Sequence, residues 1–319
     1  MKLAKAIIYI SLNLLSFSVV SQCTEIDSVR LNPQKTIKCV SVLQWNRYDS
    51  SAYKLLCQFD TIHFLYIGSS KVGKIPTGEK APVIDSIEVS DVYETKTICQ
   101  PVYNEFYKVK GLHYIGVNSQ SIEGFPRSLL QAVNLRCICL SSPNYLKGSV
   151  PKEISQLKNL EVLEFNHTQF KNIPKDVFQL GNLQSILIEC ASLDTNVRID
   201  FKKLGKLKKL YLKVKTRINW NTFFVNPEFA TIQKIEISSP VFSQQLPGAI
   251  YKLSSLKEIN ITANSSNDIT RDISALVNLR TLIITFKVTP SNDEVKRIES
   301  YLPSCKVLLF DKKGNCLER

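Results

Sequence analysis

A short pattern of apolar residues recurs along almost the whole chain, and it limits the fold more than any other feature. The pattern is an apolar residue, two residues of any kind, a second apolar residue, one residue of any kind and a third apolar residue. It begins at Ile37, Ile62, Ile84, Leu112, Leu135, Leu160, Leu183, Leu207, Ile232, Leu256 and Leu279, and a degenerate twelfth copy begins at Leu302. The mean spacing is about 24 residues, which lies in the range of roughly 20 to 50 residues that marks solenoids and other repeat arrays.

Each copy of the pattern predicts one short strand followed by a turn. The last two apolar residues alternate with polar ones, as in a strand with one buried face. Segments such as "IPKDVFQL" and "FPRSLLQ" then supply a short helical turn. One repeat cannot bury its own apolar face, so neighbouring repeats must stack into a continuous core. We therefore expect a parallel sheet of about eleven strands on a concave face, with short helices or turns on the convex face.

One copy, "LEVLEFNHTQFKNIP", resembles the leucine-rich repeat family and its LxxLxLxxNxLxxIP pattern. "LKGSVPKEISQL" and "QQLPGAIYKLSSL" resemble the longer extracellular variety of that repeat. The resemblance covers about residues 37–310 and implies an α/β leucine-rich repeat solenoid, or horseshoe. The family's inward Asn is replaced in all repeats but one, by Trp45, Ser70, Val92, Gln120, Pro143, Thr168, Ala191, Lys215, Pro240 and Lys287, while Asn264 is standard. We therefore expect irregular loops after the strands.

The two ends of the solenoid are expected to differ from the middle, because open ends must be covered. Residues 23–47 are interpreted as an N-terminal cap with the first strand, residues 48–290 as the repeats and residues 291–319 as a C-terminal cap. Within the last segment, Ser291 and Glu294 form a capping-box pattern at the start of a predicted helix, and Pro303 follows its end. The interval from Ile84 to Leu112 is the longest, so an extra loop or turn is expected there.

The first 22 residues resemble an export signal rather than part of the fold. "MKLAK" is a short basic region, "AIIYISLNLLSFSVV" is an apolar region, and cleavage is expected after Ser21 or Gln22. Lipidation at Cys23 is the alternative processing, although Gln22 is larger than the small residue that usually precedes a lipidated Cys. No later segment is long and apolar enough to span a bilayer. The predicted location is therefore secreted or cell-surface, and the leader favours a bacterial source.

The nine cysteines are interpreted for an oxidising compartment if the chain is exported. Their odd number leaves at least one of them free, lipidated or paired between chains. The candidate disulfide joins Cys305 and Cys316, because "CKVLLFDKKGNC" combines a strand with a turn that could fold back. Asn166, Asn260 and Asn264 are glycosylation acceptors only in a eukaryotic host.

A search for catalytic motifs is negative. The sequence has three histidines and no Gly-rich phosphate loop, HExxH or GxSxG motif, so no cofactor and no enzymatic activity are predicted. Cys137 and Cys139, in "RCICL", are two residues apart on one predicted strand, and both are expected to point away from the core. Ordinary thiols or a bridge explain them best, because two Cys without a nearby His are too few for a structural zinc site. A metal-binding or redox role is the alternative.

When the repeats stack, equivalent positions of successive repeats form rows about 5 Å apart. In the N-terminal half these rows predict a mixed aromatic and acidic surface, formed by His63, Phe64, Tyr66, Asp85, Glu88, His113 and Tyr114. Aromatic residues on a rigid concave face are common anchors in protein recognition. The alternative is a surface partly covered by the N-terminal loop.

A second candidate surface lies in the lysine-rich stretch "FKKLGKLKKLYLKVKTR". Lys208, Lys209, Tyr211 and Lys213 are expected to face the concave side, where an anionic glycan, lipid head group or acidic protein could dock by charge. Glu189 and Glu236 lie close enough in the predicted rows to neutralise part of this charge. The alternative is a solvated face that keeps an exported protein soluble.

The sequence as a whole predicts an exported, non-enzymatic binding scaffold for a protein or an anionic glycan. The net charge of +13 falls to +11 when the leader's two lysines are removed, which favours anionic partners. Nucleic acid is not expected, because aromatic residues are sparse among the lysines. Two other functions stay open: an extracellular inhibitor or regulator of a hydrolase, and a thiol-dependent activity at Cys137 and Cys139. The oligomeric state is not predicted.

Overall fold

The chain forms a repeating strand-and-turn structure, known here from a computed structural model. The structure describes residues 24–25, 36–43, 49–68, 75–91, 105–119, 122, 124–142, 146–171, 173–190, 197–214, 220–238, 246 and 248–317. The expected leader, Cys23, Lys215 and the loop predicted between Ile84 and Leu112, over residues 92–104, lie outside these residues.

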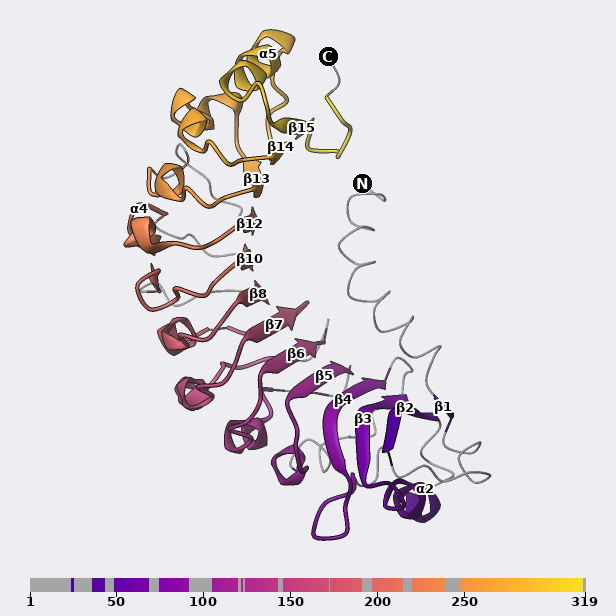
Figure 1. The fold of residues 1–319 in the computed structure, drawn as a ribbon. Helices are drawn as coiled ribbons and strands as arrows, with labels where there is room; N and C mark the ends of the chain where they lie inside the picture. The colour runs from indigo at the N-terminus through magenta and orange to yellow at the C-terminus, as the bar shows by residue number, and fades with distance from the viewer. Residues whose placement is uncertain are drawn as a thin grey trace. The chain divides into compact units, whose positions relative to one another are not determined.

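Parallel strands follow one another at the predicted period (Figure 1). The strands of the main sheet are β1 (Thr24–Glu25), β2 (Thr36–Leu43), β3 (Thr61–Gly68), β4 (Val83–Asp91), β5 (Tyr114–Ser119), β6 (Cys137–Ser141), β7 (Val162–Asn166), β8 (Ser185–Cys190), β10 (Lys209–Val214), β12 (Lys234–Ser238), β13 (Glu258–Ala263), β14 (Thr281–Phe286) and β15 (Lys306–Phe310). Twelve of them, β2 to β15 in this list, correspond to the twelve pattern copies. The predicted strand positions are therefore confirmed.

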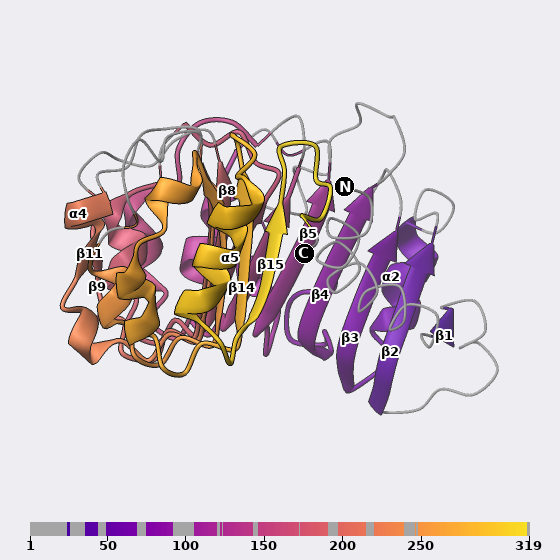
Figure 2. The ribbon, with the colours of Figure 1, turned by 90° about the horizontal axis from the view of Figure 1, so that it is seen from above.

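Within each unit, short helical segments lie on one side of the strands (Figure 1), and Figure 2 shows the same elements from above. Most are 3₁₀ helices: η3 (Phe106–Lys108), η4 (Arg127–Gln131), η5 (Lys152–Gln156), η6 (Lys175–Gln179), η7 (Pro227–Phe229), η8 (Ile250–Lys252), η9 (Ser266–Asp268) and η10 (Arg271–Ala275). The α-helices are α2 (Asp49–Leu56), α4 (Trp220–Phe223) and α5 (Asn292–Tyr301). A second, two-stranded sheet pairs β9 (Ile199–Asp200) with β11 (Phe224–Val225).

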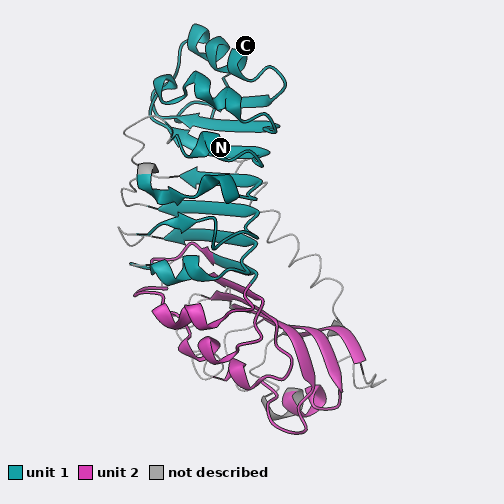
Figure 3. Cartoon of the chain, turned by 60° about the vertical axis from the view of Figure 1, so that its left-hand side comes forward, with its two compact units in different colours: residues 1, 161–164, 170–319 teal, residues 2–160, 165–169 magenta. Residues whose placement is uncertain are grey.

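The chain divides into two compact units, with the boundary near β7 (Figure 3). The N-terminal unit consists of residues 2–160 and 165–169, and its strands pair in parallel from β1 to β6 in chain order. The C-terminal unit contains residues 161–164 and 170–319, and its strands pair in the order β8, β10, β12, β13, β14 and β15. Each unit therefore repeats the same strand-and-turn element.

The core of each unit is built from the apolar positions of the pattern. All first apolar residues of the copies from Ile62 to Leu302 are buried, and Ile37 is half-buried. The alternation within strands is equally clear: in β8 the side chains of Ile186, Ile188 and Cys190 are buried, while Ser185, Leu187 and Glu189 are half-exposed. Residues that alternate in this way place one face of the sheet against the core and leave the other as a surface.

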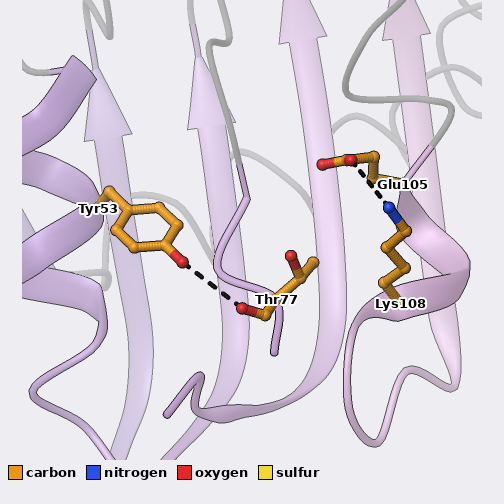
Figure 4. Close-up of polar contacts among 4 residues, drawn as sticks. All are labelled: Tyr53, Thr77, Glu105 and Lys108. Carbon is orange, nitrogen blue, oxygen red and sulfur yellow. Dashed lines mark hydrogen bonds and ion pairs between the residues drawn. The ribbon is translucent and has the colours of Figure 1, made fainter. Parts of the chain in front are cut away.

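Polar contacts hold the connecting segments of the N-terminal unit (Figure 4). The hydroxyl of Tyr53, on α2, donates to the carbonyl oxygen of Thr77 over 3.5 Å, which links the helix to the segment before β4. Lys108 donates to Glu105 over 3.1 Å across η3, and this hydrogen bond raises the pKa of the lysine. The longest repeat thus contains a 3₁₀ turn whose Phe106 side chain is fully buried.

The predicted C-terminal helix is confirmed as α5. The Ser291 side chain accepts from the backbone N–H of Glu294, and the Glu294 carboxylate accepts from the backbone N–H of Ser291. Ser266 also donates to Glu294, so these contacts lower the pKa of that carboxyl. The hydrogen bond from Ser266 therefore links the helix start to η9 of the preceding repeat.

The candidate disulfide between Cys305 and Cys316 is not formed in this structure, where both residues are free thiols. The chain does turn back after β15, as expected, with Gly314 at a φ of 83°. The turn places Cys316 opposite Phe310 rather than opposite Cys305. Five residues of strand separate these positions, or about 16 Å, which is too far for a disulfide. Cys39, on β2, is disulfide-bonded.

Candidate functional site

The aromatic and acidic surface predicted in the N-terminal half is brought together on neighbouring strands of the N-terminal unit. We call it the aromatic–acidic patch: His63, Phe64 and Tyr66 from β3, Asp85 and Glu88 from β4, His113 immediately before β5, and Tyr114 from β5. The parallel register aligns Phe64 with Ser86 and Tyr114, and Tyr66 with Glu88. All seven side chains are exposed or half-exposed, so they form one accessible surface within this unit.

The first polar pair of the patch joins His63 to Asp85. The Nδ1 atom of His63 lies 2.5 Å from Oδ2 of Asp85 on the next strand. About half of the His63 side chain, 52%, is accessible to solvent, so the pair is well hydrated. Exposed pairs of this kind contribute little to stability. The pair fixes the orientation of the imidazole at the strand start.

The carboxyl group of Glu88 is the chemically unusual member of the patch. Burial raises its pKa, and Glu88 forms no ion pair with any residue in the described part of the chain. Burial also raises the pKa of the neighbouring Tyr66, whose hydroxyl bonds to Ser90, and the charge of Glu88 acts in the same direction. A half-buried carboxyl beside aromatic rings is a site where a partner's donor could bind with little competition from water.

Gly116 shapes the surface beside Glu88 and was missed by the sequence analysis. It lies opposite Glu88 in the register, in the interior of β5. A Cβ atom at this position would lie 2.8 Å from the hydroxyl oxygen of Tyr114 and 3.3 Å from Cγ of Glu88. The ring of Tyr114 therefore leans across the glycine, and a Cβ atom there would require the tyrosine side chain to shift. A glycine inside a strand often marks such a close approach, and that was the available signal.

Cys137 and Cys139 lie on β6, next to Tyr114 and Gly116 in the register. Both are half-exposed and separated by buried Ile138, so the prediction that both point away from the core is confirmed. Their sulfur atoms are 3.6 Å apart. No group of three or more potential metal ligands among His, Cys, Asp and Glu occurs within the described residues.

The lysine-rich surface of the C-terminal unit is less basic than its sequence suggests. Lys213 forms an ion pair with Glu189, its direct partner on β8. Lys208 and Lys209 are exposed and form no ion pair with any residue that the structure describes. The neutralisation considered from the sequence thus occurs at Lys213, and the unpaired charge lies at the start of β10.

Tyr211 belongs to a polar row that the sequence analysis did not identify. The register aligns Tyr211 with Glu236 on β12 and Glu236 with Asn260 on β13. Glu236 is hydrogen-bonded to both neighbours, and burial raises its pKa to about 7 even though these bonds and Lys234 act in the opposite direction. Burial and the nearby Glu236 raise the pKa of Tyr211.

The Glu236 row predicts a specific pH dependence of stability. The folded-state pKa of Glu236, about 7, exceeds the ordinary value of 4.5. The contribution of this carboxyl to the free energy of unfolding is therefore fully present below pH 4.5 and is lost as the pH rises through 7. We expect Glu236→Gln to remove this loss and to raise the free energy of unfolding at pH 8 by up to about 3 kcal/mol. Urea unfolding of both proteins at pH 4 and pH 8 measures the difference.

The control for this experiment is Glu228→Gln, because Glu228 is exposed on η7. It should leave the pH dependence unchanged. Equal stability profiles for wild type and Glu236→Gln would show that the Glu236 carboxyl is hydrated like any surface acid.

Comparisons with known proteins agree with the repeat geometry. No family model matches the chain. It is 28% identical over 156 residues to the TMV resistance protein N of Nicotiana glutinosa, an alignment that covers 48% of this chain and 14% of that protein. The mouse RP105/MD-1 complex is a solved structure with a TM-score of 0.54 and 16% identity, covering 87% of this chain and 52% of that chain. The alignment with an internalin of Listeria monocytogenes covers 86% of this chain and 66% of that chain, with a TM-score of 0.44 and 15% identity.

Strand order, period and structural likeness together define the fold class: the chain is an α/β leucine-rich repeat solenoid. The chain spans only 14% and 6% of the lengths of two curated relatives that it matches, so their activities are not carried over to it. Among the described residues, no helix has the length and apolar character needed to cross a membrane.

Proposed function

We propose that the chain is an exported, non-enzymatic scaffold that binds a protein ligand on the aromatic–acidic patch. The observation that carries the proposal is the combination of Tyr66, Tyr114 and the half-buried Glu88 on adjacent strands of one exposed sheet face. Rigid aromatic side chains bury much area at low entropic cost, and a desolvated carboxyl supplies directional specificity. Binding by solved repeat proteins of this fold, such as RP105 in its complex with MD-1, is consistent with such a role.

Export is part of the proposal and has its own support. Cys39 is disulfide-bonded, and disulfides persist mainly in oxidising compartments. We expect the mature protein to begin at Gln22 or Cys23, which intact-mass measurement of the protein from its native host would show. A chain that keeps Met1 would contradict export, and an added diacylglycerol mass would indicate lipidation at Cys23.

The patch is tested by comparing which proteins the immobilised chain retains from extracellular material. The variant Phe64→Ala/Tyr66→Ala removes two anchors from β3, whereas Val133→Ala/Val277→Ala removes two exposed side chains outside the patch. A partner retained by wild type and by the control, but lost with the patch variant, supports the proposal. Partners that all three proteins retain equally would overturn it. Recovery of a hydrolase whose activity the chain lowers would identify the inhibitor function.

A second candidate function, binding of an anionic glycan, is favoured by the uncompensated charge at Lys208 and Lys209. We expect Lys208→Gln/Lys209→Gln to slow association with a sulfated polysaccharide such as heparin and to weaken its salt dependence, because exposed charges steer encounter. Surface plasmon resonance at several salt concentrations measures both quantities.

The matched control is Lys213→Gln, since the Lys213 charge is paired with Glu189. It should change the association rate less than the double variant does. If the double variant associates at the wild-type rate with the wild-type salt dependence, the lysines serve solubility only.

A further inference from the structure

We propose that Cys137 and Cys139 form a bidentate thiolate site for a thiophilic metal ion of the Zn²⁺ or Cu⁺ kind on the exposed face of the N-terminal unit. The site adjoins the aromatic–acidic patch, because Cys137 lies next to Tyr114 in the register, but it does not depend on the binding proposed for that patch. It follows from the geometry of β6 and its neighbour β5.

The separation of the two sulfur atoms fits metal chelation. They lie 3.6 Å apart in the structure. Two thiolates bound to one tetrahedral ion at a metal–sulfur distance of about 2.3 Å are separated by about 3.8 Å. The side chains therefore need to move by only a few tenths of an ångström to hold an ion between them.

The strand itself holds the two thiols side by side. Side chains two residues apart on a strand point to the same face, and buried Ile138 between them anchors β6 to the core. Both thiols are half-exposed, so an ion can reach them from solvent. A mobile loop would have to be ordered before it could offer two ligands together, but this pair is already placed.

The surroundings favour a soft ion with open coordination positions. Thiolate ligands select Zn²⁺, Cu⁺ and other thiophilic ions over Mg²⁺ and Ca²⁺. Gly116 lies opposite Cys139 and has no side chain, and the hydroxyl of Tyr114 occupies the space above it. Two protein sulfurs leave two positions of a tetrahedral ion open, which water or a donor from another molecule would fill.

Cys57 in the N-terminal unit and Cys305 in the C-terminal unit are thiols with which metal binding by the pair can be compared. Burial raises the pKa of Cys57 and of Cys305, and each lies alone in the sequence. A metal-binding thiol must lose its proton, so a single thiol of raised pKa is a poor ligand. These two residues are therefore suitable control positions.

The experiment is a titration of the full-length protein, with the Cys39 disulfide intact and the remaining thiols reduced, with Cd²⁺ alone, followed by the ultraviolet thiolate-to-metal charge-transfer band. We expect saturation at one ion per chain, with affinity that increases with pH because binding releases thiol protons. Cys137→Ser and Cys139→Ser should each lower the affinity by more than the roughly 10- to 100-fold that loss of an outer-shell partner causes.

Cys57→Ser and Cys305→Ser should retain the wild-type band and affinity. Serine is close to cysteine in size and both chelating thiols are half-exposed, so all four variants should fold, which their melting temperatures would check. A reduced wild type without the charge-transfer band would overturn the proposal. It would equally be overturned if the band persisted unchanged in Cys137→Ser and Cys139→Ser.

Discussion

Replacing Leu163 by alanine is expected to lower the free energy of unfolding by about 2 to 5 kcal/mol, because a large apolar side chain is removed from a closely packed core. Leu163 is the central apolar residue of β7 and has no solvent exposure. Chemical denaturation followed by circular dichroism measures the change.

The matched control is Leu187→Ala on β8, where a residue of the same type lies on the exposed face of the sheet. Its loss should cost less than about 1 kcal/mol, since half-exposed side chains leave little cavity. Equal losses for the two variants would mean that the inward and outward faces of the strands have been assigned incorrectly.

Phe201→Ala is expected to destabilise the C-terminal unit by about 3 to 5 kcal/mol. The Phe201 ring is fully buried at the start of the lysine-rich stretch and stacks on Phe224, with centroids 5.8 Å apart and planes at 21°. This contact lies beside the small sheet of β9 and β11 and anchors the segment that leads to Lys208 and Lys209. Thermal and urea unfolding both report the loss.

Phe229→Ala is the control for Phe201, because the Phe229 ring is 50% exposed and its described contact is with the Lys202 ammonium, 4.9 Å from the ring centroid. We expect a change of about 0.5 to 1 kcal/mol from the lost cation–π interaction. A Phe201 variant as stable as this control would show that the small sheet is not anchored through the aromatic stack.

The strand positions could be predicted because each repeat contains, at fixed positions, the apolar residues that form its part of the core. Residues such as Leu160 and Leu183 recur at the same place in each copy, and their burial is a local property of the pattern. The capping box at Ser291 was predictable for the same reason, since its partners are three residues apart.

Interactions between repeats were harder to predict, because they depend on the register of neighbouring strands. Lys213 pairs with Glu189, and Glu236 bonds to Tyr211 and Asn260, across 24 or 25 residues of sequence. Aligning the repeats suggests these neighbours but does not show how deeply their carboxyl groups are buried. The pKa of about 7 at Glu236 depends on that burial and so required the structure.

The candidate disulfide shows a further limit of sequence reasoning. The turn after β15 was predictable from its Gly and Asn, but the offset of the returning segment was not. A shift of a few residues brought Cys316 to Phe310 instead of Cys305. In the patch, the lean of Tyr114 over Gly116 likewise depends on a side-chain direction that spacing alone does not define.

Hydroxyl-radical footprinting of the chain with and without a captured protein partner tests the central claim most directly. Our account predicts that the partner lowers the oxidation of Phe64, Tyr66 and Tyr114 while leaving Tyr107 and Phe229, which are 37% and 50% exposed outside the patch, oxidised as before. Protection of Tyr107 or Phe229 with undiminished oxidation of Phe64, Tyr66 and Tyr114 would contradict binding at the aromatic–acidic patch.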